Sequence, residues 1–360
     1  MSAHRARISA VRERLREQGL GALVVTQTAN VRYLTGYVGS NGTAVVGLEG
    51  AVLLTDSRYA LSAREQVEAA EVLIGSRDLL GDIATAAVAR AGEGPIAIEA
   101  DAVTVDWHER FCSRIDGHPV RPVTGLVQEL RLIKDTDEIG TMRRAAAVAD
   151  RALARVVGRG LVGRSERAVA FEIYRAVLEE GGEDLSFPTI VAAGPRGARP
   201  HAIPGDEPIP PDTLVVIDMG AIVDGYCSDM TRTYATGPLP ERLREIYTLC
   251  HDAQRAALAA TRPGIACADL DAVARDAIEA GGYGGHFGHG LGHGGGLEIH
   301  EAPGGRPGDR RVLAAGMAIT IEPGIYLEGV AGVRIEDLVI VTEDGCEMIS
   351  TSPKDLTVVD

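Results

Sequence analysis

Four acidic residues of this chain lie within segments that otherwise have the composition of buried β-strands: Asp218 in LVVIDMG, Asp229 in CSDMTRT, Glu322 in AITIEPG and Glu336 in RIEDLVIV. Acidic side chains are rarely buried without a partner, because removing a charge from water costs a large amount of free energy. The fold of this chain must therefore supply partners for these acids.

The dipeptide Asp224-Gly225 predicts how the first two acids are arranged. Asp-Gly between runs of β-forming residues is a strong signal for a two-residue hairpin turn. In such a hairpin Asp218 lies opposite Thr231, and Asp229 is its diagonal neighbour on the same face, roughly 7–8 Å away at the backbone. Both carboxylates can then reach one point, whereas Asp224 is interpreted as a turn residue.

Glu322 and Glu336 repeat this arrangement. A loop centred near Gly329 would place them on opposing strands. One such acid could equally face solvent, but two converging pairs make a surface explanation improbable. Buried carboxylates this close together repel one another, so either protons or cations must compensate their charge.

The stretch GGHFGHGLGHGGGLEIHE, residues 284–301, contains four histidines among many glycines. Neutral imidazole is a common ligand of divalent ions, and glycine lets the backbone approach a site closely. We expect this stretch to supply the remaining ligand and interpret His286, which is off the spacing of the others, as structural. The GxGxxG pattern here follows a helical segment rather than a strand, and no HExxH or GxSxG motif is present, so other common sites are not indicated.

The length of 360 residues predicts two domains. In the first third, the Val/Ile/Leu-rich runs GALVVTQ, TAVVGLE, AVLLTD and PIAIEA alternate with helical patterns and predict an α/β domain with a mixed sheet. A long amphipathic pattern follows, with Asp135 as the N-cap and Glu138 as its capping-box partner. Further helices at SERAVAFEIYRAVLEEGG, ERLREIYTLCHDAQRAALAATRPG and ADLDAVARDAIEAGG, with Gly-punctuated strands, indicate an α+β second domain.

Charge and composition exclude several classes of partner. The formal net charge of -15 argues against nucleic-acid binding, which depends on Lys and Arg. The N-terminus lacks the apolar region of a signal peptide, and no run is long enough to span a membrane. Five scattered cysteines, without a CxxC pair, suit a reducing compartment. We therefore expect a cytoplasmic protein with no nucleic-acid or membrane partner.

Asp218 and Asp229, followed by HGLGHGGGLEIHE, IEPGIY and RIED, resemble the proline-specific metallopeptidases of the pita-bread fold, aminopeptidase P and prolidase. NVRYLTGYVGSNGTAVV and LLTDSRY are similar to the creatinase-type N-terminal domain of that family, and RLIKDTDEI to the beginning of its catalytic domain. The resemblance implies an α/β creatinase-like domain over residues 1–130 and an α+β pita-bread catalytic domain over residues 131–360.

The same resemblance implies roles for particular residues. Two metal ions would be held by Asp218, Asp229, His293, Glu322 and Glu336. His300 would lie near the scissile carbonyl, His289 would line the substrate site, His201 would be a further active-site histidine, and Arg334 would support the ligands. The basic run GPRGARPH and the glycines after His293 depart from the family pattern, which bears on substrate preference.

Four carboxylates and one imidazole form a hard donor set, so we expect Mn²⁺, with Co²⁺ or Zn²⁺ able to substitute. Two such ions can lower the pKa of a shared water. Glu322 is then expected to carry a proton from the water to the leaving nitrogen, and His300 and His201 to stabilise the oxyanion.

The expected function is that of an Xaa-Pro aminopeptidase, which releases an N-terminal residue preceding proline. The alternative is an Xaa-Pro dipeptidase, or prolidase, and its substrate would likewise have proline at the second position. More distant alternatives are a metal-dependent lyase or hydrolase of a small non-peptide substrate and a non-catalytic binding protein. The resemblance also implies a homodimer in which Tyr33 to Ser40 or Arg58 of one subunit border the other's active site.

Overall fold

The computed structural model describes residues 2–360. The chain divides into two compact units, the first ending at Arg131 and the second beginning at Leu132. The first unit is α/β and the second is α+β, as the sequence predicts.

The first unit is built on a six-stranded mixed sheet with the order β4-β3-β2-β1-β5-β6. The four predicted strands are confirmed as β1, β2, β3 and β5. The sequence did not reveal β4 and β6, because both are edge strands with few buried residues. The elements are α1 (Ala3–Glu17), β1 (Ala22–Val25), α2 (Thr28–Thr35), β2 (Thr43–Gly47), β3 (Ala51–Thr55), η1 (Ser57–Tyr59), α3 (Ala60–Gln66), β4 (Glu71–Ile74), α4 (Leu79–Ala91), β5 (Ile96–Glu99), α5 (Val105–Cys112), β6 (Val120–Val123) and α6 (Gln128–Arg131).

Two residues expected to reach a partner subunit differ in exposure. Tyr33 is 5% exposed, and its hydroxyl donates to the Leu130 carbonyl within the same unit. Whether residues 33–40 border another subunit stays a prediction. Arg58 is exposed but forms an ion pair with Asp56 at 2.9 Å. Formation of a homodimer stays a prediction.

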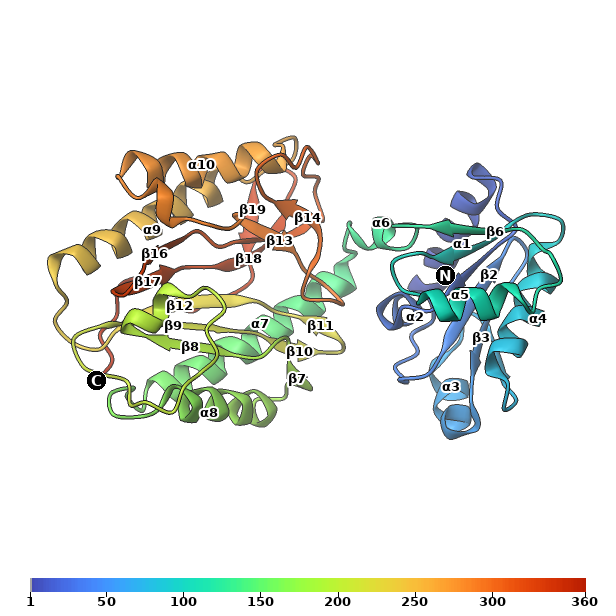
Figure 1. Cartoon of the computed structure of the whole chain (residues 1–360), viewed down its shortest axis with the longest axis horizontal. Helices are drawn as coiled ribbons and strands as arrows, with labels where there is room; N and C mark the ends of the chain where they lie inside the picture. Colours follow the sequence, from blue (N-terminus) through green and yellow to red (C-terminus); the bar gives the residue numbers. More distant parts are fainter. Residues whose placement is uncertain (1) are drawn as a thin grey trace. The chain divides into compact units, whose positions relative to one another are not determined.

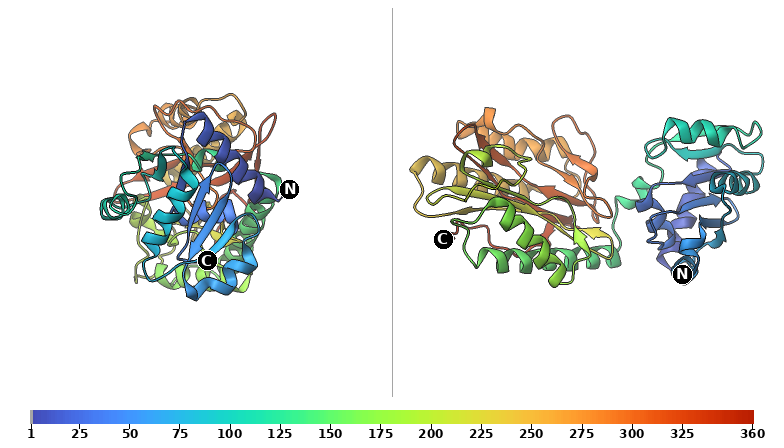
Figure 2. Two further views of the ribbon diagram at one scale, coloured as in Figure 1. Left: turned by 90° about the vertical axis from the view of Figure 1, so that its right-hand side faces the viewer. Right: turned by 60° about the horizontal axis from the view of Figure 1, so that its bottom comes forward.

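In the second unit, helices α7 and α8 lie on one side of the strands and α9 and α10 on the other (Figures 1 and 2). No helix within residues 2–360 is long and apolar enough to cross a membrane. The helices are α7 (Thr136–Val157), α8 (Glu166–Glu179), η2 (Gly194–Ala198), α9 (Glu241–Ala260), α10 (Cys267–Ala280) and η3 (Gly284–His286). The strands are β7 (Asp184–Leu185), β8 (Ile190–Ala193), β9 (Leu214–Met219), β10 (Ala221–Val223), β11 (Tyr226–Cys227), β12 (Met230–Ala235), β13 (Gly292–Gly294), β14 (Glu301–Gly305), β15 (Ala318–Ile321), β16 (Gly324–Leu327), β17 (Ala331–Arg334), β18 (Asp337–Val341) and β19 (Cys346–Met348).

Helix α7 begins as its sequence predicts. The Asp135 carboxylate accepts from the backbone N–H groups of Asp137 and Glu138, and the Glu138 carboxylate accepts from the N–H of Asp135. This reciprocal capping box satisfies N–H groups that the first turn of a helix leaves free. It confirms the predicted start of the first helix of the second unit.

The hairpin that carries Asp218 and Asp229, here called the first acidic ribbon, has the predicted register. Val223 pairs with Tyr226, and Asp218 pairs with Thr231. Asp224 and Gly225 have φ of 45° and 73°, the positive values that a tight hairpin turn requires. Asp229 differs slightly from expectation, since it lies directly before β12 rather than within a strand.

The second ribbon also has the predicted register, but its two acids lie at breaks in the strands. Gly324 pairs with Arg334 in one ladder, and Ile321 pairs with Asp337 in the next. Glu322 and Glu336 lie in the unpaired interval between these two ladders. Proline at position 323 has no N–H to donate, which interrupts the ladder at this point. The break frees both glutamates from regular pairing.

Candidate active site

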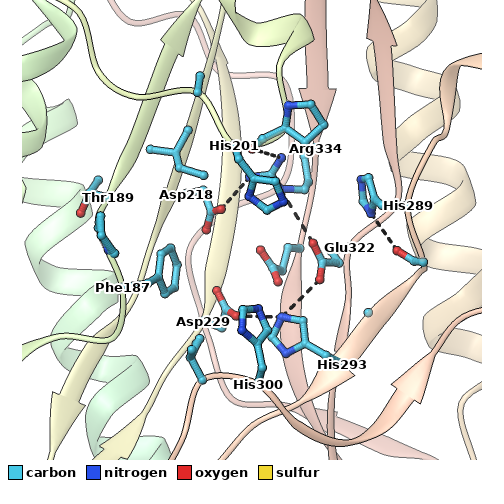
Figure 3. A pocket seen from close by; sticks show the side chains of 18 of the residues that line it. Phe187, Thr189, His201, Asp218, Asp229, His289, His293, His300, Glu322 and Arg334 are labelled. Atoms are coloured by element: carbon cyan, nitrogen blue, oxygen red, sulfur yellow. Dashed lines mark hydrogen bonds and ion pairs between the residues drawn. The ribbon is translucent and has the colours of Figure 1, made fainter.

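The four acids and His293 meet at a cavity of about 500 Å³ in the second unit. Figure 3 shows the side chains of Asp218, Asp229, Glu322 and His293 pointing toward a common space. The other predicted site residues, His201, His289, His300 and Arg334, also line this cavity. The structure therefore brings all nine predicted residues together, from segments separated by up to 135 positions between His201 and Glu336.

Asp218 is held by Arg334. The Nη2 of this buried arginine donates to Oδ2 of Asp218 at 2.6 Å. The second oxygen, Oδ1, is buried and accepts no hydrogen bond from any residue that the structure describes. A buried carboxylate oxygen without a donor carries a substantial desolvation cost. It is therefore a ready ligand for a cation.

The ring of His293 is also oriented so that it could bind a cation. Its Nδ1 donates to the Gly294 carbonyl at 3.0 Å, so in the neutral ring Nε2 carries a lone pair. Burial lowers the pKa of His293 to about 4, which keeps the ring neutral at neutral pH. Nε2 lies 3.5 Å from Oδ2 of Asp229 and 3.5 Å from Oε1 of Glu322. Three electron-rich atoms that face one another repel unless a proton or a cation compensates them.

Glu336 is joined to the first ribbon through Thr231. The Thr231 hydroxyl donates to Oε2 of Glu336 at 2.5 Å and accepts from Nε of Arg334 at 3.1 Å. The backbone N–H of Glu336 donates to the Thr231 carbonyl at 3.1 Å. Thr231 was identified from the sequence only as the residue opposite Asp218, and the structure shows that it also orients a second carboxylate.

The electrostatics of these acids fit a site for divalent cations. Burial, and then the neighbouring carboxylates, raise the pKa of Asp229 and of Glu336 well above their ordinary values. Burial raises the pKa of Glu322 to about 7, although Arg334 acts in the opposite direction. One potential ligand atom from each of Asp229, His293 and Glu336 lies within 4.8 Å of the others. Such a set of oxygen and imidazole donors suits hard divalent ions.

Tyr326 is a site residue that the sequence reasoning missed. Its hydroxyl accepts from Nη1 of Arg334 at 3.0 Å and lies 2.8 Å from Nε2 of His289. Because Nδ1 of His289 donates to the Gly290 carbonyl, Nε2 must accept from this hydroxyl. The hairpin register would have revealed Tyr326, since it places Tyr326 diagonally opposite Arg334.

Glycine is required next to His293. A Cβ on Gly292 would lie 1.9 Å from the carbonyl oxygen of Thr320. The N–H of His293 donates to the Thr320 hydroxyl at 2.9 Å, and that hydroxyl donates to Oε1 of Glu322 at 3.1 Å. The glycine thus allows the close approach of two segments that carry candidate ligands.

His300 lies beside the metal-ligand candidates but is itself exposed. Its ring centroid is 4.4 Å from that of His293, in an edge-on arrangement. The next residue, Glu301, forms an ion pair at 3.2 Å with Lys134, and both side chains are almost fully buried. This buried pair fixes the backbone from which His300 projects into the cavity.

The basic run GPRGARPH does not place its first arginine in the cavity. Arg196 donates to the buried carboxylate of Glu166 at 2.8 Å and to the Ile203 carbonyl. Glu166 also accepts from the backbone N–H groups of Ala193 and Gly205. Arg196 therefore stabilises the loop that carries His201, and its role in this unusual run is structural.

Arg306 is the second residue that the sequence reasoning missed. It is exposed, lines the cavity and forms no ion pair with any of residues 2–360. Arg334, the other arginine of the cavity, is already paired with Asp218. No pattern in the sequence points to Arg306, because it lies in an irregular Gly- and Pro-rich loop.

The shifted pKa values of the site residues predict how pH affects the stability of the metal-free protein. Asp229, Glu322 and Glu336 have raised pKa values, so the folded protein retains protons that the unfolded chain has lost, and their contribution to stability falls as pH rises. The lowered pKa values of His289 and His293 act oppositely, but only below the unfolded pKa of about 6.5. From about pH 6.5 to 8 we expect the melting temperature to fall in EDTA and to be nearly constant with saturating Mn²⁺. A melting temperature that rises with pH in EDTA would contradict this reading.

Comparison with known proteins finds relatives that match this chain over nearly its whole length. Residues 7–133 match the Creatinase/Prolidase N-terminal domain, and residues 140–343 match metallopeptidase family M24. The chain is 34% identical over 342 residues to an Xaa-Pro dipeptidase of Pyrococcus furiosus, covering 94% of this chain and 96% of that protein. The structure of an Xaa-Pro dipeptidase from Bacillus anthracis superposes with a TM-score of 0.96 at 36% identity, covering 99% of this chain and 100% of the other. An X-Pro aminopeptidase from Thermotoga maritima gives a TM-score of 0.90 at 32% identity, covering 96% and 100%.

Proposed function

The chain belongs to metallopeptidase family M24 and is a metallo-exopeptidase of the Xaa-Pro type, and from that premise we propose that its substrates are Xaa-Pro dipeptides. The sequence favoured an aminopeptidase acting on longer peptides. The similarity to Xaa-Pro dipeptidases supports the dipeptidase alternative better, although an aminopeptidase is among the similar structures. The two activities differ in whether the substrate ends at proline. The residues of the cavity that contact the carboxyl end of the substrate therefore decide between them.

The unpaired guanidinium of Arg306 is the observation that carries this proposal. In an Xaa-Pro dipeptide the α-carboxylate of proline itself is free, and arginine binds carboxylates through two parallel hydrogen bonds. A longer peptide has a neutral amide at that position and continues beyond it. A free cation at the edge of the cavity therefore favours the shorter substrate.

The protein uses divalent metal ions, as its family implies. We assign Asp218, Asp229, His293, Glu322 and Glu336 as the residues that would hold two of them, with Mn²⁺ as the preferred ion. The orphaned Oδ1 of Asp218 and the lone pair of His293 support this assignment. Bound divalent ions supply an activated water and polarise the peptide carbonyl.

The side chains around the ligands perform the remaining steps in this proposal. Glu322 takes a proton from the attacking water and delivers it to the proline nitrogen, which has no hydrogen in the Xaa-Pro bond. His300 and His201, both exposed at the cavity, donate hydrogen bonds to the developing oxyanion. Arg334 holds Asp218 in place throughout.

Turnover of Ala-Pro, Ala-Pro-amide and Ala-Pro-Ala in the presence of Mn²⁺ tests the proposal. A dipeptidase should cleave Ala-Pro with the highest kcat/KM of the three. Faster cleavage of Ala-Pro-Ala would identify an aminopeptidase instead. Cleavage of none of them would favour a small non-peptide substrate.

Arg306→Gln should separate the same substrates. Loss of a charge-assisted hydrogen bond of roughly 1.5–3 kcal/mol should raise KM for Ala-Pro by about 10- to 100-fold. KM for Ala-Pro-amide should change much less, because that substrate has no carboxylate. Arg310→Gln is the matched control, since Arg310 is exposed in the same loop and does not line the cavity. Equal effects of Arg306→Gln on both substrates would show that Arg306 does not recognise the carboxylate.

A further inference from the structure

The centre of the glycine-rich stretch is fastened to helix α10 by two residues, Asp271 and Arg275. Arg275 donates from Nη1 to the Phe287 carbonyl at 2.9 Å and from Nη2 to the His289 carbonyl at 2.7 Å. Asp271 accepts from the backbone N–H of Leu291 at 2.9 Å. Three alternate residues of a segment that belongs to no helix or strand are thus tied to one turn of α10.

The two side chains form a single rigid unit. Nε and Nη2 of Arg275 donate to the two oxygens of Asp271 at 2.8 and 2.9 Å, in a bidentate pair at i,i+4 spacing. Asp271 is 1% exposed, and the guanidinium carbon lies 4.4 Å from the centre of the Phe287 ring. Because glycine loses more conformational entropy than other residues on ordering, this segment needs such external contacts to hold one conformation.

The fastened segment leads directly to two residues of the site. The Leu291 carbonyl accepts from the backbone N–H of Glu322 at 2.8 Å, so a single residue, Leu291, links Asp271 to Glu322. The His289 carbonyl is held by Arg275, while its ring is held by the Tyr326 hydroxyl. A shift of this segment would therefore move both the backbone of Glu322 and the ring of His289.

We propose that Asp271 and Arg275 are positioning residues for the reaction, which fix Glu322 and His289 through the main chain of residues 287–291 without touching the substrate. This inference rests on the proposed function, in which Glu322 binds metal and carries a proton. A misplacement of about 1 Å can cost on the order of 10²-fold in rate. Replacement of either residue should therefore lower kcat and change KM only slightly.

Arg275→Ala should lower kcat for Ala-Pro by about 10- to 100-fold at saturating Mn²⁺, with KM changed by less than about threefold. Amide exchange in residues 287–291 should become faster, and Mn²⁺ should bind more weakly. Methylguanidinium added to the variant should restore part of kcat. Arg275→Lys, which keeps the charge beside Asp271 but cannot reach both carbonyls in the same way, provides a milder second variant and should show intermediate values.

Arg151→Ala is the matched control. Arg151 also donates to one carboxylate and one backbone carbonyl, both of Glu180, but on helix α7 and outside the cavity. The inference is overturned if Arg275→Ala lowers kcat no more than Arg151→Ala does, or if exchange in residues 287–291 is unchanged. If the wild type cleaves no Xaa-Pro peptide, the proposed function fails instead. Amide exchange in residues 287–291 and Mn²⁺ affinity then still test the positioning role. If both quantities are the same in Arg275→Ala and the wild type, that role is rejected.

Discussion

Asp229→Asn should lower kcat/KM for Ala-Pro by at least about 10³-fold and reduce the Mn²⁺ bound per chain. The carboxylate of Asp229 faces Nε2 of His293 at 3.5 Å and lies among the other acids. Stabilisation of transition-state charge by metal is worth several kcal/mol, and about 4 kcal/mol corresponds to a factor of 10³ in rate. Asparagine keeps the shape of the side chain but removes the negative charge, so the expected loss arises from weaker metal binding rather than from a cavity in the core.

Asp224→Asn is the control for this variant. Asp224 lies in the same ribbon, five residues before Asp229, but it is an exposed turn residue with φ of 45° and an ion pair to Arg144. Asparagine tolerates positive φ well, so the turn should be preserved and activity should stay near that of the wild type. Activity and metal content that are unchanged in Asp229→Asn, measured by turnover and by elemental analysis, would reject the assigned metal site.

His300→Ala should lower kcat by about 10²- to 10³-fold with a smaller effect on KM. This is the usual cost of removing one donor to a developing oxyanion. The side chain of His300 is exposed, and its ring contacts that of His293 at the edge of the cavity. The variant should therefore fold and bind Mn²⁺ as the wild type does, and the loss should appear in the chemical step.

His286→Ala serves as the comparison for His300→Ala. His286 belongs to the same glycine-rich stretch, is exposed and contacts the Tyr326 carbonyl at 3.1 Å, but it does not line the cavity. Its replacement should leave kcat within about threefold of the wild type. If the two variants behave alike in steady-state kinetics with Ala-Pro, His300 has no special role in stabilising the oxyanion.

Local patterns predicted much of the fold because they depend on interactions close in sequence. The capping box of Asp135 and Glu138 and the Asp224-Gly225 turn each involve residues within a few positions of one another. The period-2 alternation of strands then fixes which side chains share a face, which is why the pairing of Asp218 with Thr231 could be stated in advance. The edge strands β4 and β6 lacked such a pattern because neither has a continuous buried face.

The pairing of the acidic residues within each ribbon could be predicted from the chain alone, because hairpin register follows from turn chemistry and strand periodicity. The histidines expected to join them could be named in the same way. The meeting of the two ribbons, the contacts of Arg334 with Asp218 and Thr231, and the place of Arg306 in the cavity lining became visible in the folded molecule. The tertiary structure also revealed the contacts of Arg275 with the glycine-rich segment. Long-range contacts of this kind depend on how whole layers pack, and no short-range pattern in the chain encodes that packing.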